Sequence, residues 1–255
     1  RTLLRNAMKQ SKACIFIGQG FIGGAPDGTT TTLGREGSDY SAAVAANILD
    51  AESMSVWKDV DGILNADPKV FPDAVQIAEL NYLDTIELAY SGAQIIHPKT
   101  IKPLQNKNIP LYVRPFGDKR KPGTVIRRMS APIEVPILIL KKDQVLLTIR
   151  SRDFSFVLEE KFAAIFSLLE RYRIKVNLVH NSAVNLSLCV DNSWHIDEAI
   201  QALRNEEFDV MKVENMELLT IRGYNGDLME RYASGPEVFL LQRTQSTARI
   251  VRKNR

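Results

Sequence analysis

One short sequence that occurs twice constrains the fold more than any other feature of this chain. Leu146–Arg150 and Leu218–Arg222 both read Leu-Leu-Thr-Ile-Arg. Each copy stands where the surrounding pattern predicts the strand that opens a structural unit, so we interpret the repetition as a domain duplication. The carboxy-terminal part of the chain is therefore expected to contain two related domains.

The first of these domains is predicted to follow the order strand, helix, strand, strand, helix, strand. Apolar side chains recur at helical spacing in both helices, which places one apolar stripe on each. The stripes are Phe162, Ile165, Phe166 and Leu169, then Ile196, Ala199, Ile200 and Leu203. The strands are expected at Val145–Arg150, Lys175–His180, Val184–Val190 and Asp209–Val213. This order predicts a ferredoxin-like βαββαβ unit with both helices on one side of an antiparallel sheet.

The second domain has too few elements for a complete unit. Its strands are expected at Glu217–Arg222, Glu237–Gln242 and Ser246–Val251. We expect it to borrow Pro136–Leu140, a strand that precedes the first domain. The predicted divisions are an amino-terminal domain at residues 1–128, a linker with the borrowed strand at 129–144, the first domain at 145–214 and the incomplete second at 215–255.

In the amino-terminal domain, short apolar runs alternate with helical patterns. Strands are expected at Ala13–Ile17, Ser53–Trp57 and Leu111–Val113, and helices at Ser38–Leu49, Leu80–Tyr90 and Lys99–Asn106. This alternation predicts an α/β domain with a largely parallel sheet.

Composition narrows the possible partners and compartments. The 33 basic and 30 acidic side chains nearly cancel and are interspersed, which argues against a nucleic-acid or membrane surface. The longest apolar run, Val135–Leu140, is far shorter than the roughly 20 residues of a membrane-spanning helix. Cys14 and Cys189 are far apart in the sequence, which argues against a disulfide scaffold or a thiolate metal site. Their pattern fits a reducing compartment, and we expect the cytoplasm. His180 and His195 show no metal-ligand spacing, so no metal held by protein side chains is expected.

Between Gly20 and Asp39, glycines, hydroxyl groups, a guanidinium and a carboxylate gather around a predicted helix start. Glycines let the backbone approach a ligand closely, and the N–H groups of a helix start attract anions. Arg35 can hold a carboxylate through two hydrogen bonds, and Asp39 can hold an ammonium group. A zwitterionic amino acid would suit this pair. The alternative is that Ser38 or Asp39 only caps the helix and that Arg35 is a surface residue.

A second polar segment, Trp57–Lys69, follows an apolar strand and contains Gly and Pro turns. Open α/β sheets bind ligands at the carboxyl ends of their strands, where this loop would lie. Lys58 and Lys69 could neutralise nucleotide phosphates, and Asp59 could bind a base or a ribose. The alternative is a loop built only of ordinary turns.

These two segments, together with a later one, resemble the aspartate kinase branch of the amino-acid kinase family. The matching motifs are Gln19–Phe21, Thr31–Asp39, Asp59–Lys69 and Gly92–Pro98. The resemblance covers nearly all of Arg1–Arg127, and four ordered motifs are more specific together than any one alone. It implies an amino-acid kinase-type three-layer sandwich, here the partial, nucleotide-side lobe. It also implies transfer of the γ-phosphoryl group of ATP to the β-carboxylate of L-aspartate, with Mg²⁺ bridging the phosphates.

The same resemblance implies two sets of site residues. The aspartate site would comprise Phe21, Arg35, Ser38 and Asp39, with Arg35 and Asp39 as the catalytic pair. The ATP site would comprise Lys58, Asp59, Leu64, Asp67, Lys69 and Gln94. Gln94 stands where many relatives carry Lys, and Leu64 stands where an aromatic often packs on adenine. His97 precedes Pro98 at a helix start, where we expect a structural role and not proton transfer.

One segment of the family's pattern is missing from the chain. The Lys-x-Gly-Gly segment, whose lysine faces the transferred phosphoryl group, does not occur in these 255 residues. We therefore expect the chain to be catalytically inactive alone. An alternative is a non-catalytic amino-acid sensor that kept a vestigial kinase lobe. Another amino-acid kinase, such as one acting on glutamate, is disfavoured because its relatives carry a different carboxy-terminal module.

The predicted βαββαβ units resemble paired ACT domains, which in this family bind lysine, threonine or a similar end product and inhibit the kinase. The resemblance implies a homodimer through these domains and an effector pocket formed by Phe156, Leu158, Val176, Asn177 and Ser182. Asn177 occupies a position that is Asp in some lysine-inhibited relatives, and an amide stabilises a ligand ammonium less than a carboxylate does. The alternative is a degenerate pair of domains that only dimerises.

Overall fold

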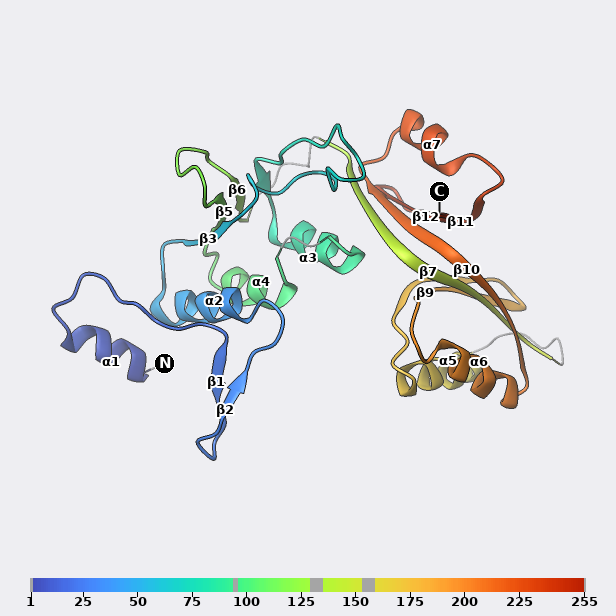
Figure 1. Cartoon of the computed structure of the whole chain (residues 1–255), viewed down its shortest axis with the longest axis horizontal. Coiled ribbons are helices and arrows are strands. Elements are labelled where there is room, and N and C mark those ends of the chain that lie inside the picture. Colours follow the sequence, from blue (N-terminus) through green and yellow to red (C-terminus); the bar gives the residue numbers. More distant parts are fainter. Residues whose placement is uncertain (1, 94–95, 129–134, 153–158, 255) are drawn as a thin grey trace. The chain divides into compact units, whose positions relative to one another are not determined.

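The computed structural model describes residues 2–93, 96–128, 135–152 and 159–254. The chain forms two compact units, Arg1–Val135 and Pro136–Arg255 (Figure 1). Each unit has its own buried core and its own sheet. Residues 129–134 of the expected linker lie outside the described ranges. Within those ranges, no helix is long and apolar enough to cross a membrane.

The first unit is a small α/β domain. Its helices are α1 (Thr2–Gln10), α2 (Gly37–Leu49), α3 (Tyr82–Ser91) and α4 (Pro98–Gln105). Its strands are β1 (Ile22–Gly24), β2 (Thr30–Thr32), β3 (Met54–Lys58), β4 (Glu79–Leu80), β5 (Leu111–Pro115) and β6 (Thr124–Ile126). β1 and β2 form an antiparallel hairpin, and the other strands form one sheet in the order β3-β5-β6-β4. The β5–β6 pair is antiparallel while its neighbours are parallel, so the expected largely parallel sheet is mixed.

Buried and less buried side chains alternate along β3 and β5, and the buried ones form one face of this sheet. Met54 and Val56 in β3 are buried, as are Leu111 and Val113 in β5, while the residues between them are not. Strand side chains alternate in direction, so these four share one face. Helices α2 and α4 contact each other and lie on one side of the sheet (Figure 1). The fully buried Ala43 in α2 is small enough to permit this close packing.

Ala13–Ile17 does not form the expected strand. The segment has no regular secondary structure, and Ile15 and Ile17 are 81% and 97% exposed. A strand is stable only when a neighbour completes its hydrogen bonds, and no strand of the described ranges pairs with this segment. The prediction rested on an apolar run, which is not sufficient without such a neighbour.

The second unit is a six-stranded antiparallel sheet with three helices in its described part. The strands are β7 (Ile137–Ser151), β8 (Val176–Asn181), β9 (Asn185–Asp191), β10 (Phe208–Arg222), β11 (Val238–Arg243) and β12 (Thr247–Lys253). The helices are α5 (Glu159–Arg171), α6 (Ile196–Asn205) and α7 (Gly226–Ala233). The strand order is β11-β12-β10-β7-β9-β8. From β7 to β10, the elements follow the predicted βαββαβ order, so the ferredoxin-like prediction is confirmed.

Two pairs of predicted strands are each one long strand. β7 joins the segments that begin at Pro136 and Val145, and β10 joins those that begin at Asp209 and Glu217. Inside them, Asp143 and Asn215 have positive φ values of 55° and 57°, and the pairing of β7 with β10 shifts register nearby. Asp and Asn favour turns, so such bulges resemble strand ends in a sequence. The ladder nevertheless continues beyond them.

The repeated five residues occupy equivalent places in these long strands. Leu146–Arg150, in the second half of β7, pairs with the first half of β10. Leu218–Arg222, in the second half of β10, pairs with the first half of β7. In the β7–β10 pair, the second half of each strand therefore pairs with the first half of the other, so the pair has approximate two-fold symmetry. A domain duplication would produce this symmetry.

Helices α5 and α6 cover one face of this sheet (Figure 1). The α6 stripe, Ile196, Ala199, Ile200 and Leu203, is buried as predicted. In α5, Ile165 and Leu169 are buried, but Phe166 is 36% exposed, so the buried stripe is narrower than predicted. Leu146, Leu178 and Cys189 belong to a different core cluster on the opposite face.

Candidate functional site

The segment that begins at Gly20 folds against the start of α2. Phe21 has a positive φ of 75°, its N–H donates to Ser41 Oγ at 3.1 Å, and its carbonyl accepts from the Leu33 N–H at 2.8 Å. A Cβ on Gly37 would lie 2.9 Å from Cδ2 of Phe21, and one on Gly20 would lie 3.0 Å from Cα of Ser38. Both glycines are therefore required for this close approach.

The sequence left open the alternative that Ser38 or Asp39 only caps helix α2, and the structure does not have this cap. The N-cap residue of α2 is Glu36, which has a φ of 55° and makes no side-chain capping bond. Neither Ser38 nor Asp39 is the cap, and Asp39 lies in the first turn. The Glu36 carboxylate instead accepts from the His97 N–H at 2.7 Å. That bond fixes His97, near the end of the fourth sequence motif, beside the start of α2.

His97 has the structural role expected from the sequence. It is the N-cap of α4, and its Nδ1 accepts from the Lys99 N–H at 3.1 Å. Pro98 follows at the first helical position, where its missing N–H costs nothing.

Lys58 and Asp39 join the two predicted ligand sites. Lys58 Nζ lies 2.8 Å from Oδ2 of Asp39, and the side chains are 29% and 18% exposed. Asp39 comes from the first turn of α2, and Lys58 is the last residue of β3. The Lys58 carbonyl accepts from the Phe116 N–H at 2.7 Å, which holds the strand end in place. The structure therefore brings residues of three sequence motifs into contact, and it places Lys58, the residue directly before the remaining motif, Asp59–Lys69, beside Asp39.

The other predicted aspartate-site residues surround this ion pair along the chain. Arg35 and Ser38 are exposed, and Phe21 is 43% exposed. In the part of the chain that the structure describes, Arg35 makes no hydrogen bond or ion pair. Its guanidinium is accordingly available for a ligand carboxylate.

The loop after β3 is held by hydrogen bonds across its base. Thr124 Oγ1 accepts from the Ile63 N–H at 2.8 Å and donates to the Ile77 carbonyl at 2.6 Å. Gly62 has a φ of 149°, and a Cβ there would lie 2.5 Å from Nε2 of Gln76 and 2.8 Å from Thr124 Oγ1. Only glycine fits this position without strain. The loop is thus a fixed structure and not a loose turn.

The remaining predicted nucleotide residues lie along this loop. Asp59, Asp67 and Lys69 are exposed, and Leu64 is half-buried and forms a bridge with Gln76. Asp67 Oδ1 accepts from the Lys69 N–H at 2.9 Å, which forms a tight turn. Gln94 lies outside the described residues. The described residues contain no group of three or more His, Cys, Asp or Glu side chains that could hold a metal ion.

In the second unit, two of the predicted effector residues, Phe156 and Leu158, lie outside the described ranges. Val176 is half-buried, and Ser182 is exposed at the turn between β8 and β9, where its Oγ accepts from the Asn185 N–H at 3.1 Å. Asn177 lies at a register shift in β8, which turns its side chain towards polar groups on β7 and β9.

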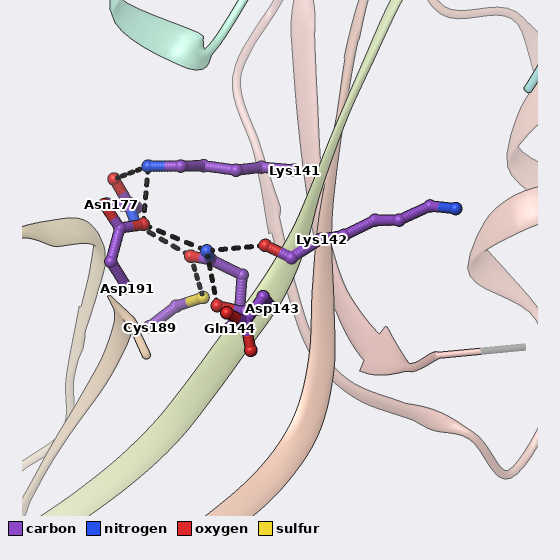
Figure 2. Close-up of polar contacts among 7 residues, drawn as sticks. All are labelled: Lys141, Lys142, Asp143, Gln144, Asn177, Cys189 and Asp191. Atoms are coloured by element: carbon purple, nitrogen blue, oxygen red, sulfur yellow. Dashed lines mark hydrogen bonds and ion pairs between the residues drawn. The ribbon is translucent and has the colours of Figure 1, made fainter. Parts of the chain in front are cut away.

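Sequence reasoning missed the polar cluster around Asn177. Figure 2 shows Lys141 and Gln144 of β7 converging with Asn177 and with Asp191 and Cys189 of β9. The signal for it is the polar run Lys141–Gln144, which interrupts two apolar halves of one strand. Pairing across the sheet, which no local pattern shows, supplies the partners.

The cluster sets the ionisation of its acidic groups. Burial opposes ionisation of Asp191, but hydrogen bonds from Lys141, Gln144 and Asn177, with the charge of Lys141, lower its pKa below the usual 3.8. Burial raises the pKa of the Cys189 thiol to about 12, so it stays protonated. The cluster therefore contains one carboxylate and one ammonium, paired with each other.

Comparison with known proteins identifies relatives for both units. Residues 1–115 match the model of the "Amino acid kinase family". Lysine-sensitive aspartokinase 3 of Escherichia coli (strain K12) is 35% identical over 233 residues, which cover 88% of this chain and 51% of that protein. Aspartokinase 1, chloroplastic, of Arabidopsis thaliana is 36% identical over 209 residues, covering 77% of this chain and 36% of the relative. The chain thus spans about half or less of the length of these relatives.

Solved structures extend the likeness to three dimensions. E. coli aspartokinase III in complex with aspartate and ADP aligns with a TM-score of 0.74 at 29% identity, over 92% of this chain and 56% of that chain. The same protein in complex with lysine and aspartate gives 0.70 at 30% identity, over 91% and 55%. Clostridium acetobutylicum aspartate kinase, at 20% identity, shows the same fold with a TM-score of 0.80, over 92% of this chain and 58% of that one. These likenesses confirm the fold class expected from the sequence.

Proposed function

Because this chain belongs with the aspartokinases of the amino acid kinase family, we propose that it carries the aspartate site, the nucleotide loop and the regulatory domains of an aspartate kinase. The reaction is transfer of the γ-phosphoryl group of ATP to the β-carboxylate of L-aspartate. The observation that carries the proposal is the Asp39–Lys58 contact, because it joins the segment proposed to bind an amino acid to the segment proposed to bind phosphate. E. coli aspartokinase III has been solved with aspartate and ADP, which supports this choice of ligands.

The aspartate site is proposed to work by charge complementarity. Arg35 binds the α-carboxylate through two hydrogen bonds, and Asp39 binds the α-ammonium. Ser38 and Phe21 form the adjoining wall. This arrangement leaves the β-carboxylate of the substrate free to attack, and phosphoryl transfer needs positioning and charge neutralisation but no covalent nucleophile.

The nucleotide side is proposed to use the loop after β3. The ammonium groups of Lys58 and Lys69 fit the phosphates, and Asp59 fits the ribose or base. Leu64, Asp67 and Gln94 would adjoin the nucleotide. The exposure of Asp59 and Lys69, on a loop that its base holds rigid, fits a binding role. ATP would supply the phosphoryl group, and Mg²⁺ would enter with its phosphates.

The Lys-x-Gly-Gly segment that the family resemblance leads us to expect does not occur in these 255 residues. We therefore propose that this chain alone binds ligands without turning them over. The second candidate, a non-catalytic sensor with a vestigial kinase lobe, rests on the same absence. Reading the coding sequence ahead of Arg1 discriminates them: a Gly-Gly phosphate loop supports the kinase, and a start codon directly before Arg1 supports the sensor.

A protein that includes such a loop allows the activity itself to be tested. Aspartyl phosphate is trapped with hydroxylamine and measured as the hydroxamate. Asp39→Ala should abolish its formation, because the substrate ammonium loses its counter-charge. Unchanged turnover would rule out the assigned aspartate site.

For the second unit we propose feedback regulation by an amino acid, lysine or threonine, within a homodimer formed through these ACT-type domains. The proposed pocket comprises Phe156, Leu158, Val176, Asn177 and Ser182. Escherichia coli aspartokinase III has been solved with lysine, which supports an amino-acid effector of this class. Calorimetry with lysine, threonine and methionine should show at most one binder.

We place the protein in the cytoplasm, where Cys14 and Cys189 would remain the free thiols that they are here.

A further inference from the structure

The polar cluster of the second unit contains a bound ammonium group that belongs to the chain itself. Lys141 Nζ lies 2.6 Å from Oδ1 of Asp191 and 2.9 Å from Oδ1 of Asn177 (Figure 2). The Lys141 and Asp191 side chains are 21% and 33% exposed, so the pair is partly shielded from water. A carboxylate and an amide carbonyl that converge in this way are the ligands that a primary ammonium prefers.

Asn177 has no donor left for a ligand. Its Nδ2 donates to Oε1 of Gln144 and to Oδ1 of Asp191, each at 2.7 Å. A primary amide has two N–H donors, so both are used. Gln144, only 1% exposed, donates in turn to Asp191 Oδ1 at 3.0 Å. The niche is therefore built and rigid, and Lys141 completes it.

We propose that Asp191, Asn177 and Gln144 form an ammonium-binding niche in the first βαββαβ unit, and that the chain fills this niche with its own Lys141. The ammonium group of Lys141 thereby prevents the ammonium group of a free ligand from binding at Asn177. The inference deepens the regulatory role proposed above and rests on it for the class of ligand that is excluded. A tethered ammonium has an effective concentration of about millimolar or more, so a free amino acid competes poorly. An effector of this unit must then bind without placing a cationic group at Asn177.

The proposal can be tested by removing Lys141, because the niche should then bind a free ammonium compound. Lys141→Ala leaves Asp191 partly buried without its counter-ion, so the thermal midpoint of the 255-residue chain should fall. Ethylammonium should fit the vacated niche and raise that midpoint by about 4 °C at about ten times its dissociation constant. Tetramethylammonium, which has no N–H donor, should not.

Lys142→Ala is the matched control, because Lys142 is the next residue, is exposed and points away from the cluster in Figure 2. Neither the wild type nor Lys142→Ala should respond to ethylammonium. The double variant Lys141→Ala, Asp191→Asn should lose the response. The proposal is overturned if ethylammonium stabilises Lys141→Ala no more than tetramethylammonium does, or if it stabilises the wild type equally.

Lys141→Met keeps the aliphatic stem and serves if Lys141→Ala does not fold. In that variant the carboxyl carbon of Asp191, followed by NMR, should titrate at higher pH than in the wild type. An unchanged titration would show that Lys141 is not the counter-ion of Asp191. Aspartate binding by the first unit is measured separately, so failure here leaves the proposed kinase function untouched.

Discussion

The ammonium group of Lys58 lies 2.8 Å from the carboxylate of Asp39, although the residues are 19 positions apart in the sequence. One residue ends a strand, and the other lies in the first turn of a helix. In the proposed enzyme, Asp39 binds the substrate ammonium and Lys58 binds nucleotide phosphate. Asp39 and Lys58 can each pair either with the other or with a ligand, so the binding of the two proposed ligands should be coupled.

This coupling is measurable in the chain itself. Nucleotide phosphates would attract Lys58 away from Asp39, so MgADP should raise the affinity for L-aspartate, by about 5- to 10-fold for a typical coupling energy. Lys58→Met should bind aspartate more tightly without nucleotide and should lose the coupling. Calorimetry at fixed MgADP concentrations measures both effects. Equal coupling in Lys58→Met and wild type would contradict the account.

Arg35 should be sensitive to a change that preserves its charge. Arg35→Lys replaces a planar fork, which makes two parallel hydrogen bonds, with a point charge. The affinity for L-aspartate should fall about tenfold, equivalent to about 1.4 kcal/mol for one lost charge-assisted hydrogen bond. Arg120→Lys, at a side chain that is 92% exposed, is the control. The prediction fails if both variants bind aspartate like the wild type.

The loop after β3 should depend on Gly62. A Cβ there would lie 2.5 Å from Nε2 of Gln76, at a φ of 149°. Gly62→Ala should lower the free energy of unfolding of the first unit by about 2 to 3 kcal/mol, measured by urea denaturation. Gly117→Ala is the matched control, because no atom lies within 4 Å of its Cβ position. Equal effects of the two substitutions would show that the loop is not held as described.

The second unit should lose stability in acid through Asp191. Its folded pKa is lowered below 3.8, so its contribution is present above that value and is lost as the pH falls through the folded pKa. Lys141 is one cause of the lowered pKa of Asp191, so this pKa should be lowered less in Lys141→Met. The free energy of unfolding of the variant should therefore fall less between about pH 5 and pH 2 than that of the wild type. Urea denaturation across this range, with Lys142→Met as control, measures the difference. Parallel profiles for Lys141→Met and the wild type would refute the assignment.

Elements with a strong local signal were predictable, and those that depend on distant partners were not. The α6 stripe at Ile196, Ala199, Ile200 and Leu203 needed only helical spacing and a sheet to cover. Ala13–Ile17 had an apolar pattern but no partner strand in the described ranges. At Asp143 and Asn215, turn-favouring residues marked bulges inside long strands and not their ends.

The candidate site shows the same division. The glycines at 20 and 37 and the motif order indicated where the aspartate segment would fold, because close approach of backbones leaves a local signature. The Asp39–Lys58 contact carries no such signature, since it depends on where β3 ends relative to α2. The Lys141–Asp191 contact is similar, because it arises from pairing between β7 and β9.

The central claim is that Asp39 forms the ammonium side of an aspartate site. The most direct measurement is a calorimetric titration of the 255-residue chain with L-aspartate, in the wild type and in Asp39→Asn. The wild type should bind, and Asp39→Asn should bind roughly 30-fold more weakly, because a charge-assisted hydrogen bond contributes about 2 kcal/mol. Asp73→Asn, at an exposed carboxylate, should bind like the wild type. Equal aspartate affinity in the wild type and Asp39→Asn would contradict the account.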